Sequence, residues 1–228
     1  MKLVLLSDTH RAHVEYTEIL KSVGGDLLIH AGDSDCYDLQ TAVTFMGWLA
    51  KVSKYFTHGS LVTFGNHDNY AVDPDVLESL KEMHAAENVR IAVNESIEIA
   101  GLKFWASPYS QPYGNSYSAF TLPNSELKKI YAQIPMECDV IVSHVPPFGI
   151  LDNGHGSEAL IERIEHVQPR LVIFGHIHER HGSVVKHGIT FVNASSIGTI
   201  DKGPWLPIYV EIDDKNVSVE PPGELDVT

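Results

Sequence analysis

Short polar clusters with the side chains of metal ligands follow several apolar runs in this sequence. The stretch LVTFGNHDNY (residues 61–70) places Gly65, Asn66, His67 and Asp68 directly after such a run. A turn in contact with water would explain these residue types, but an amide, an imidazole and a carboxylate in succession also suit a metal site. Four similar clusters favour the metal site: Ser7-Asp8-Thr9-His10, Gly32-Asp33 with Asp35 beyond, Ser143-His144, and Gly175-His176-Ile177-His178.

The donor atoms of these clusters form a mixed set of nitrogen and oxygen. Asp8 and His10 are two residues apart, so in an extended chain both would point to the same side, and His176 and His178 are spaced likewise. Such a set suits Mn, Fe, Zn, Ni or Co better than calcium, which prefers oxygen alone. Seven ligands are too many for one ion, but with Asp33 shared they form two sets of four. The seven candidates are Asp8, His10, Asp33, Asn66, His144, His176 and His178.

The charge of the candidate centre favours an anionic substrate. Two divalent cations would bring four positive charges, against two negative charges from Asp8 and Asp33. The neutral Asn66, in place of a further carboxylate, preserves the Lewis acidity of the ions.

Composition limits the partners and the compartment. The 228 residues carry a formal net charge of −14, which opposes passive binding to long nucleic acid or to an anionic membrane. Cys36 and Cys138 belong to no zinc-binding spacing and read as free thiols in a reducing compartment. No apolar run is long enough for a signal peptide or a membrane span. We therefore expect a soluble, cytoplasmic protein, and the sequence carries no signal for an oligomeric state.

Buried strands must position the polar clusters. Continuous apolar runs, typical of strands buried on both faces, occur at residues 2–6, 27–30, 61–64, 140–142 and 171–174. Helical spacing of apolar residues occurs at 14–23, 39–55, 74–84, 124–134 and 157–167, with helix-start signals at Asp73-Pro74 and Asn124-Ser125-Glu126. In open α/β sheets, sites gather beyond the carboxyl ends of the strands, so the five clusters can converge on one crevice.

The middle and the end of the chain indicate hairpins. They are predicted at residues 89–105, 184–192 and 208–219, and the last nine residues read as coil. No repeat and no long linker interrupts the chain, so we expect a single domain over residues 1–228.

The five clusters together resemble the calcineurin-like metallophosphoesterases. The motifs SDTH, HAGD, FGNHD, SHVPP and GHIH follow the order of that family and span residues 8 to 178. The segments GLKFWASPY, PPFGILDNGHGSEAL and FVNAS are similar to its small metallophosphoesterase-domain-containing branch, some members of which hydrolyse cyclic nucleotides. The resemblance implies an α/β fold with a two-layered β-sandwich flanked by helices (αββα).

The resemblance also implies a division of the ligands between two divalent metal ions. Manganese is favoured, with Fe, Zn, Ni, Co or Mg as alternatives. One ion is assigned to Asp8, His10, Asp33 and His178, and the other to Asp33, Asn66, His144 and His176, with Asp33 bridging.

His67 and Asp68 are the candidate catalytic residues. Adjacent side chains do not readily reach the same ion, so His67 should face the substrate while Asn66 binds metal. We expect His67 to protonate the leaving oxygen or to stabilise charge, and Asp68 to orient its ring.

These residues predict a phosphodiesterase that uses a metal-activated hydroxide on a small phosphate ester such as a cyclic nucleotide. Alternatives of the same fold are a phosphomonoesterase, a protein phosphatase or a nuclease. A metal-bound scaffold without catalysis is an alternative of another class, and the intact ligand set argues against it.

The remaining histidines and aromatic residues receive other interpretations. His30 reads as a core residue and Cys36 as a packed thiol. His155 reads as part of a flexible loop, with a substrate-side role as the alternative. The aromatic loop at 107–123 reads as a packed flap rather than a platform for base stacking. The histidines expected at the surface are His13, His58, His84, His166, His181 and His187.

Overall fold

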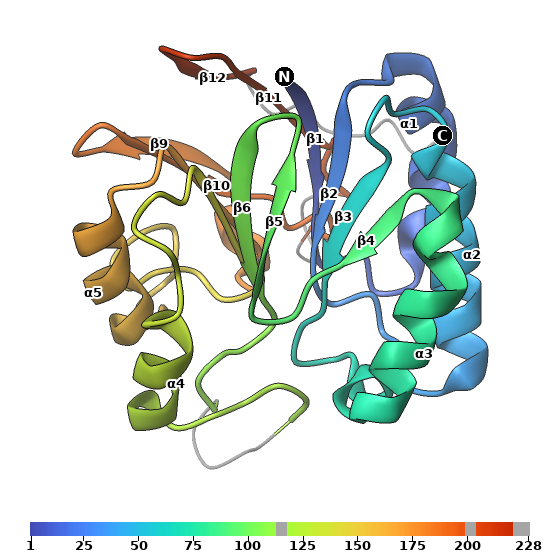
Figure 1. Cartoon of the computed structure of the whole chain (residues 1–228), viewed down its shortest axis with the longest axis horizontal. Helices are drawn as coiled ribbons and strands as arrows, with labels where there is room; N and C mark the ends of the chain where they lie inside the picture. The colour runs from blue at the N-terminus through green and yellow to red at the C-terminus, as the bar shows by residue number, and fades with distance from the viewer. Residues whose placement is uncertain (113–117, 199–203, 221–228) are drawn as a thin grey trace.

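Two six-stranded β-sheets pack face to face between layers of helices in the computed structural model of the chain (Figure 1). The structure describes residues 1–112, 118–198 and 204–220. The first sheet has the strand order β12 (Val217–Val219), β11 (Ile208–Ile212), β1 (Lys2–Leu6), β2 (Leu27–Ala31), β3 (Ser60–Thr63) and β4 (Val89–Ile91). The second has the order β5 (Glu95–Ile99), β6 (Leu102–Ser107), β7 (Val140–Ser143), β8 (Leu171–Phe174), β10 (Ile189–Asn193) and β9 (Gly182–Lys186).

Helices cover the outer face of each sheet. The first sheet packs against α1 (Thr17–Val23), α2 (Leu39–Ser53) and α3 (Pro74–His84), and the second against α4 (Asn124–Tyr131) and α5 (Glu158–Val167), as Figure 1 shows. Within the described residues, four short 3-10 helices lie at Ala12–Tyr16, Asn69–Val72, Ala85–Glu87 and His178–Arg180. This architecture confirms the predicted α/β sandwich flanked by helices.

The central strands are apolar along their length because both of their faces are covered. In β1, Leu3 and Leu5 pack between the two sheets, whereas Val4 and Leu6 pack against the helices. In β7, Val142 likewise lies between the sheets and Ile141 faces the helical layer. Successive side chains of a strand point to opposite faces, so each face receives every second residue.

Parallel pairing brings the polar clusters to one edge of the sandwich. Strands β1 to β4 are parallel to one another, and so are β6, β7, β8 and β10. A bridge between Ser7, which follows β1, and Ser195, which follows β10, connects the two sheets at this edge. The polar residues that follow the parallel strands are therefore neighbours in space.

Several predicted element boundaries differ from the observed ones. The helix expected at 14–23 begins as a 3-10 helix (Ala12–Tyr16) before α1, and α4 ends at Tyr131 rather than at 134. Asp73 caps α3 through its side chain, as expected. The expected cap of α4 is wrong, because Pro123 precedes that helix and provides no side-chain hydrogen bond. Residues 221–228, expected as coil, lie outside the described residues.

Among the described segments, no helix has both the length and the apolar character needed to cross a membrane.

The histidines are buried more often than expected. His30 is a core residue, as predicted, and its Nε2 lies 3.0 Å from Thr9 Oγ1. His166 and His187 are exposed as expected. Three further histidines expected at the surface are half-buried, namely His58, His84 and His181.

The prediction that His13 lies at the surface is wrong, because the residue is 2% exposed. Its ring lies between Phe45 and Trp48, with centroid distances of 5.4 and 5.0 Å, because the 3-10 helix turns the side chain toward α2. Neither ring nitrogen has a hydrogen-bond partner in the described part of the chain. Burial therefore disfavours the charged form and lowers the pKa of His13 from 6.5 to about 4.

Replacement of His13 with leucine should remove a pH-dependent loss of stability. Between pH 6.5 and pH 4 the unfolded chain binds a proton at this residue while the folded chain does not, so acidification favours unfolding. From pH 7 to pH 5, the free energy of unfolding should fall by about 2 kcal/mol more in the parent chain than in His13→Leu. Urea titrations over this pH range measure the difference, with His187→Leu as the exposed control. Parallel pH profiles for His13→Leu and the parent would contradict the assignment.

Candidate metal centre

One group of metal-binding side chains joins the end of β1 with the segment after β8. Asp8, His10 and His178 lie close enough together to hold one ion. His178 Nε2 is 3.4 Å from Asp8 Oδ1 and 3.3 Å from His10 Nε2. The ring nitrogens of the two histidines thus face each other beside a carboxylate.

A second group joins the ends of β2, β7 and β8. Asp33, His144 and His176 also lie close enough to hold an ion. His144 Nε2 is 3.3 Å from Asp33 Oδ2 and 3.2 Å from His176 Nδ1. The predicted amide ligand is in place beside them, with Asn66 Oδ1 at 3.0 Å from His144 Nε2.

The two groups are connected, so all seven predicted ligands meet at one edge. The backbone N–H of His176, in the second group, donates to both carboxylate oxygens of Asp8, in the first, at 3.0 and 2.9 Å. Asp33 interacts electrostatically with Asp8 and with His10. Contact of the Asp33 carboxylate with both ions stays a prediction.

The backbone at the centre is turned rather than extended. Asp8 and His10 have φ of 51° and 41°, and His176 has φ of 70°. The expectation that extended chain places each Asp/His or His/His pair on one side is therefore wrong. Asp8 and His10 meet through a turn, which is held by hydrogen bonds from Asp8 N to Gly32 O (2.8 Å) and from His10 N to Asp33 O (3.1 Å). Left-handed backbone at non-glycine residues is strained and gathers at functional sites.

Two glycines of the motifs are required by close packing against the ligands. A Cβ atom on Gly175 would overlap Asp8 Oδ2, and one on Gly65 would overlap Asp33 Oδ1 and approach His144 Cε1 to 2.7 Å. A side chain at either position would push the carboxylates out of place.

The centre fits divalent cations because, in the described part of the chain, histidines are the only ion-pair partners of its buried carboxylates. Asp8 and Asp33 are 0% and 2% exposed, and within the described ranges their ion pairs involve histidine and neither lysine nor arginine. An uncompensated buried carboxylate is costly. Cations bound between the facing imidazole nitrogens would offset this charge, and the mixed N/O donor set suits a transition metal.

Neighbouring histidines of the centre have opposite pKa shifts. Burial opposes the charged form of His144, but the Asp33 and Asp8 carboxylates and the Ala31 carbonyl together outweigh burial and raise the pKa of His144 to about 9. Burial and the nearby His144 lower the pKa of His176 to about 4. In the absence of metal, the proton of this group therefore resides on His144.

Asp68 does not orient His67, and this prediction is wrong. Its carboxylate is fully buried and accepts five hydrogen bonds, from the backbone N–H groups of Asp33, Ser34, Cys36 and Gly65 and from Ser34 Oγ. The carboxylate therefore holds the loop that carries Asp33. The burial of Cys36 in this loop confirms that its thiol is packed.

The ring of His67 has other partners. Its side chain is 46% exposed, and its Nδ1 lies 3.2 Å from the Tyr37 hydroxyl and 3.8 Å from Asp35 Oδ1. Its backbone N–H donates to Asp33 Oδ1 at 2.9 Å. The predicted orientation toward a substrate agrees with this exposure but stays a prediction.

Sequence reasoning assigned no role to three residues that contact the centre. Ser195 Oγ donates to Asp8 Oδ2 at 2.8 Å, and Asp35 and Tyr37 contact the rings of His10 and His67. Ser195 belongs to the quoted FVNAS segment and Asp35 to the second cluster, so both were visible as motif residues without a function.

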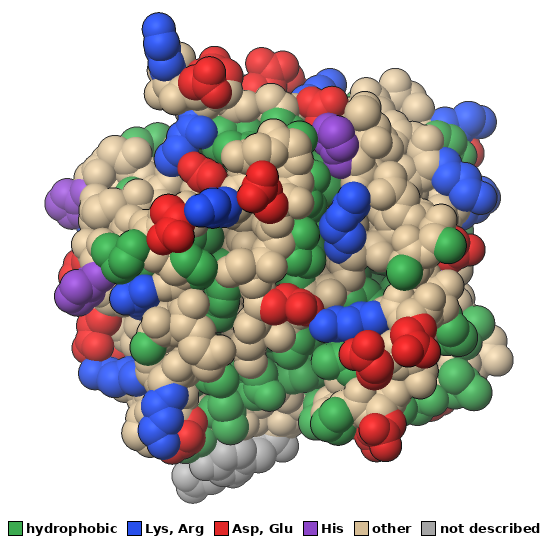
Figure 2. Space-filling view, viewed as in Figure 1, with side chains coloured by type: hydrophobic (Ala, Val, Ile, Leu, Met, Phe, Trp, Pro, Cys, Tyr) green, Lys and Arg blue, Asp and Glu red, His purple; other side chains and the backbone are tan. Residues whose placement is uncertain are grey.

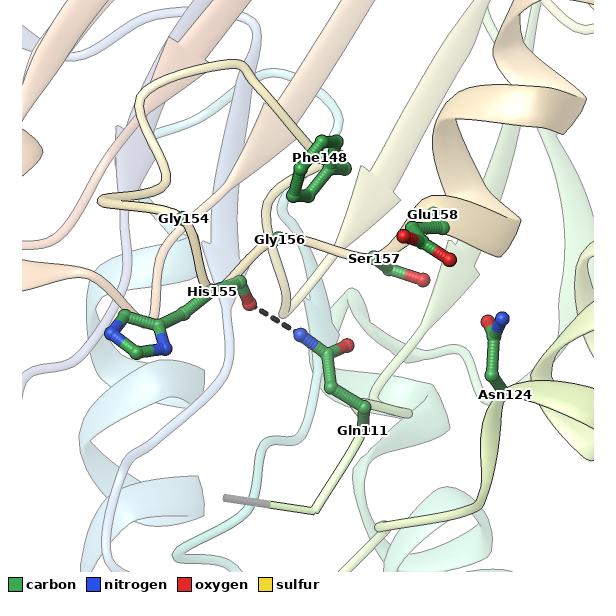
Figure 3. Close-up of a pocket in the computed structure, with 8 residues that line it drawn as sticks. All are labelled: Gln111, Asn124, Phe148, Gly154, His155, Gly156, Ser157 and Glu158. Atoms are coloured by element: carbon green, nitrogen blue, oxygen red, sulfur yellow. Dashed lines mark hydrogen bonds between the residues drawn. The ribbon is translucent and has the colours of Figure 1, made fainter. Parts of the chain in front are cut away.

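A cavity of about 300 Å³ lies at the start of α5, and none of the seven candidate ligands is among its lining residues (Figure 3). His155 contributes its backbone carbonyl, which accepts a hydrogen bond from Gln111 Nε2, while its ring points away from Gln111 and Asn124. Both interpretations of His155 stay predictions.

The described part of the aromatic loop is packed, as expected for a flap. Phe120 stacks on Phe64 at a centroid distance of 6.1 Å, and Tyr109 meets Phe120 edge-on at 5.5 Å. Trp105 is buried within β6. Tyr113 and Tyr117 lie outside the described residues.

Comparisons with known proteins agree with this geometry. A family model described as calcineurin-like phosphoesterase matches residues 1–180, a range that contains all seven candidate ligands. Metallophosphoesterase domain-containing protein 1 of Homo sapiens is 29% identical over 92% of this chain and 70% of its own length. A UPF0046 protein of Caenorhabditis elegans is 28% identical over 96% of this chain and 77% of its own.

The fold is also similar to a solved structure. TT1561 of Thermus thermophilus superimposes with a TM-score of 0.67, covering 96% of this chain and 98% of that one at 13% identity. At this identity the likeness concerns the fold alone.

Replacement of Asp68 with asparagine should destabilise the loop that carries Asp33. An amide presents one acceptor oxygen where the carboxylate presents two, so buried N–H donors lose their partner. We expect the free energy of unfolding to fall by about 3 kcal/mol or more, measured by urea denaturation. Asp214→Asn, at an exposed position, is the matched control. A change as small as that of the control would show that the carboxylate does not hold the loop.

Proposed function

Because the chain belongs to the calcineurin-like phosphoesterase family, we propose that it is a metal-dependent phosphodiesterase acting on a small phosphate ester, with cyclic nucleotides as candidate substrates. The observation that carries this proposal is the meeting of two imidazole–carboxylate groups, each able to hold an ion, at one edge of the sandwich. The hydrogen bonds from His176 N to Asp8 make the two groups parts of one centre.

The proposal assigns the seven side chains to two divalent cations, with Mn²⁺ favoured. Such ions supply Lewis acidity that lowers the pKa of water and offsets the charge of the phosphoryl group. One set is Asp8, His10, Asp33 and His178, and the other is Asp33, Asn66, His144 and His176.

The protein orients these ligands through their other atoms. The Nδ1 of His144 lies 3.0 Å from the carbonyl oxygen of Ala31, which leaves Nε2 directed at the centre. Ser195 Oγ and His176 N fix the carboxylate of Asp8. Ligands held in this way need little rearrangement when an ion binds.

His67 is the proposed general acid. It follows the proposed ligand Asn66 directly, and its side chain is 46% exposed. A protonated histidine side chain can donate a proton to the leaving oxygen as the ester bond breaks.

Surface charge supports a small substrate rather than a long nucleic acid. The net charge is −14, and on the face shown in Figure 2 Lys and Arg side chains are interspersed with Asp and Glu. A long polyanion would gain little from such a surface. A small ester needs only the local positive field of bound cations.

Metal-dependent hydrolysis tests the function directly. With added Mn²⁺, the protein should hydrolyse bis-p-nitrophenyl phosphate faster than p-nitrophenyl phosphate, and chelation should reduce the rate about 100-fold or more. A faster monoester reaction would instead favour a phosphomonoesterase. Absence of metal-dependent turnover on both compounds and on a panel of cyclic nucleotides would favour the non-catalytic scaffold.

The role of His67 can be separated from metal binding. His67→Ala should retain the metal content of the parent and lose turnover by about 100-fold or more, because a general acid contributes in that range. Metal content measured by mass spectrometry and kcat on the diester provide the two readings. His166→Ala, at an exposed position, is the control. Loss of metal from His67→Ala would show that the residue is a ligand or a structural residue.

A further inference from the structure

The Asp35 carboxylate lies beside the proposed centre but belongs to neither set of ligands. The residue is 6% exposed and has φ of 65°, so both its side chain and its backbone are constrained. Its Oδ1 is 2.8 Å from His10 Nδ1 and accepts a hydrogen bond from the Tyr37 hydroxyl at 2.9 Å. Its Oδ2 is 3.7 Å from the Nε of Arg11.

We propose that Asp35 is a positioning residue that fixes the ring of His10 directly and the ring of His67 through the Tyr37 hydroxyl. One buried carboxylate would then set the geometry of a metal ligand and of the general acid together. This inference rests on the proposed function, since it takes His10 as a ligand and His67 as the acid.

The contact with His10 selects the nitrogen that binds metal. An ionised carboxylate can only accept hydrogen bonds, so His10 Nδ1 must carry the proton that it donates to Asp35. His10 Nε2 then has a free electron pair, and this nitrogen faces His178 Nε2 at 3.3 Å. Carboxylates in this arrangement orient the ring and make the ligand more basic.

The contact with Tyr37 selects the nitrogen of His67 that faces outward. The hydroxyl has one hydrogen, which it donates to Asp35, so its oxygen accepts from His67 Nδ1 at 3.2 Å. His67 therefore keeps one proton on Nδ1, and the proton that it gives to the leaving oxygen as general acid is a second one, carried on Nε2 on the substrate side. The ring of His67 also meets that of His10 edge-on at a centroid distance of 5.0 Å, which limits its rotation.

A third metal ion is the competing interpretation of this cluster. His10, Asp35 and His67 are close enough together to hold a cation. An ion at that position would require His10 Nδ1 to lose the proton that it donates to Asp35. It would also require His10 to serve two ions through its two nitrogens. The hydrogen-bonded arrangement satisfies Asp35, Tyr37 and both rings without a third ion.

Metal titration and kinetics of two variants test the two arms of the proposal. Calorimetric titration with MnCl₂, without substrate, should show Asp35→Asn binding one of two ions about 10- to 100-fold more weakly than the parent. Tyr37→Phe should bind Mn²⁺ as the parent does, while its kcat on bis-p-nitrophenyl phosphate falls about tenfold or more at unchanged KM. Tyr55→Phe and Asp214→Asn are the controls for the loss of a hydroxyl and of a carboxylate, because neither residue has a described hydrogen bond to the centre.

Several outcomes would overturn the proposal. Unchanged Mn²⁺ affinity in Asp35→Asn would show that the carboxylate does not position His10. Unchanged kcat in Tyr37→Phe would show that the Tyr37 hydroxyl does not position His67. Three bound ions in the parent, with only the third lost in Asp35→Asn, would establish the competing metal site. If the parent hydrolyses no phosphodiester, the proposed function fails, whereas the titration still decides the role of Asp35 toward His10.

A measurement on the unaltered protein covers the case in which Asp35→Asn does not fold. Imidazole ¹⁵N NMR of the chain loaded with Zn²⁺, a diamagnetic ion, should show the Nδ1 proton on both His10 and His67. A proton on Nε2 alone in either ring would contradict the proposal.

Discussion

Two buried carboxylates dominate the chemistry of this fold. Asp8 and Asp33 follow the adjacent parallel strands β1 and β2 and are almost inaccessible to water. In the described part of the chain, no lysine or arginine side chain forms an ion pair with them. Their charge must be balanced by backbone N–H groups, a serine hydroxyl, imidazoles and the proposed cations. The turned backbone and the glycines let N–H groups and histidines approach the two carboxylates closely.

The contacts around these two carboxylates also join the two sheets. Asp8 and Asp33 come from the first sheet, whereas His144 and His176 come from the second. The bond from His176 N to Asp8 and the bridge from Ser7 to Ser195 cross between them. The centre is thus located where the two layers are held in register, and a small shift of one layer would move apart the ligands within each set. The contacts that position the ligands therefore also align the two sheets.

The sequence was sufficient for the buried parallel strands and for the meeting of the ligands, but not for many side-chain contacts. It also failed at residues 89–105, where β4 pairs with β3 in the first sheet and only β5 and β6 form a hairpin. Apolar runs followed by polar clusters reveal buried parallel strands, because burial on both faces removes the alternation of polar residues. The turn that brings Asp8 to His10, the donors to Asp68 and the burial of His13 depend on segments that are distant along the chain. Local pattern does not encode the direction in which such a side chain points. His67 and Asp68 illustrate this, since these neighbours in sequence have different partners: the ring of His67 contacts the Tyr37 hydroxyl, whereas the Asp68 carboxylate accepts hydrogen bonds from backbone N–H groups.

The pairing of β1 with β11 has a consequence for biosynthesis. Lys2 lies opposite Glu211, so β1 finds its neighbour on this side only after the ribosome has translated the chain as far as β11. Contacts of such high sequence separation form slowly. Until β11 emerges, the nascent polypeptide exposes the unpaired edge of β1 in the first sheet. Chaperones can recognise such an edge, and strands of other chains can pair with it.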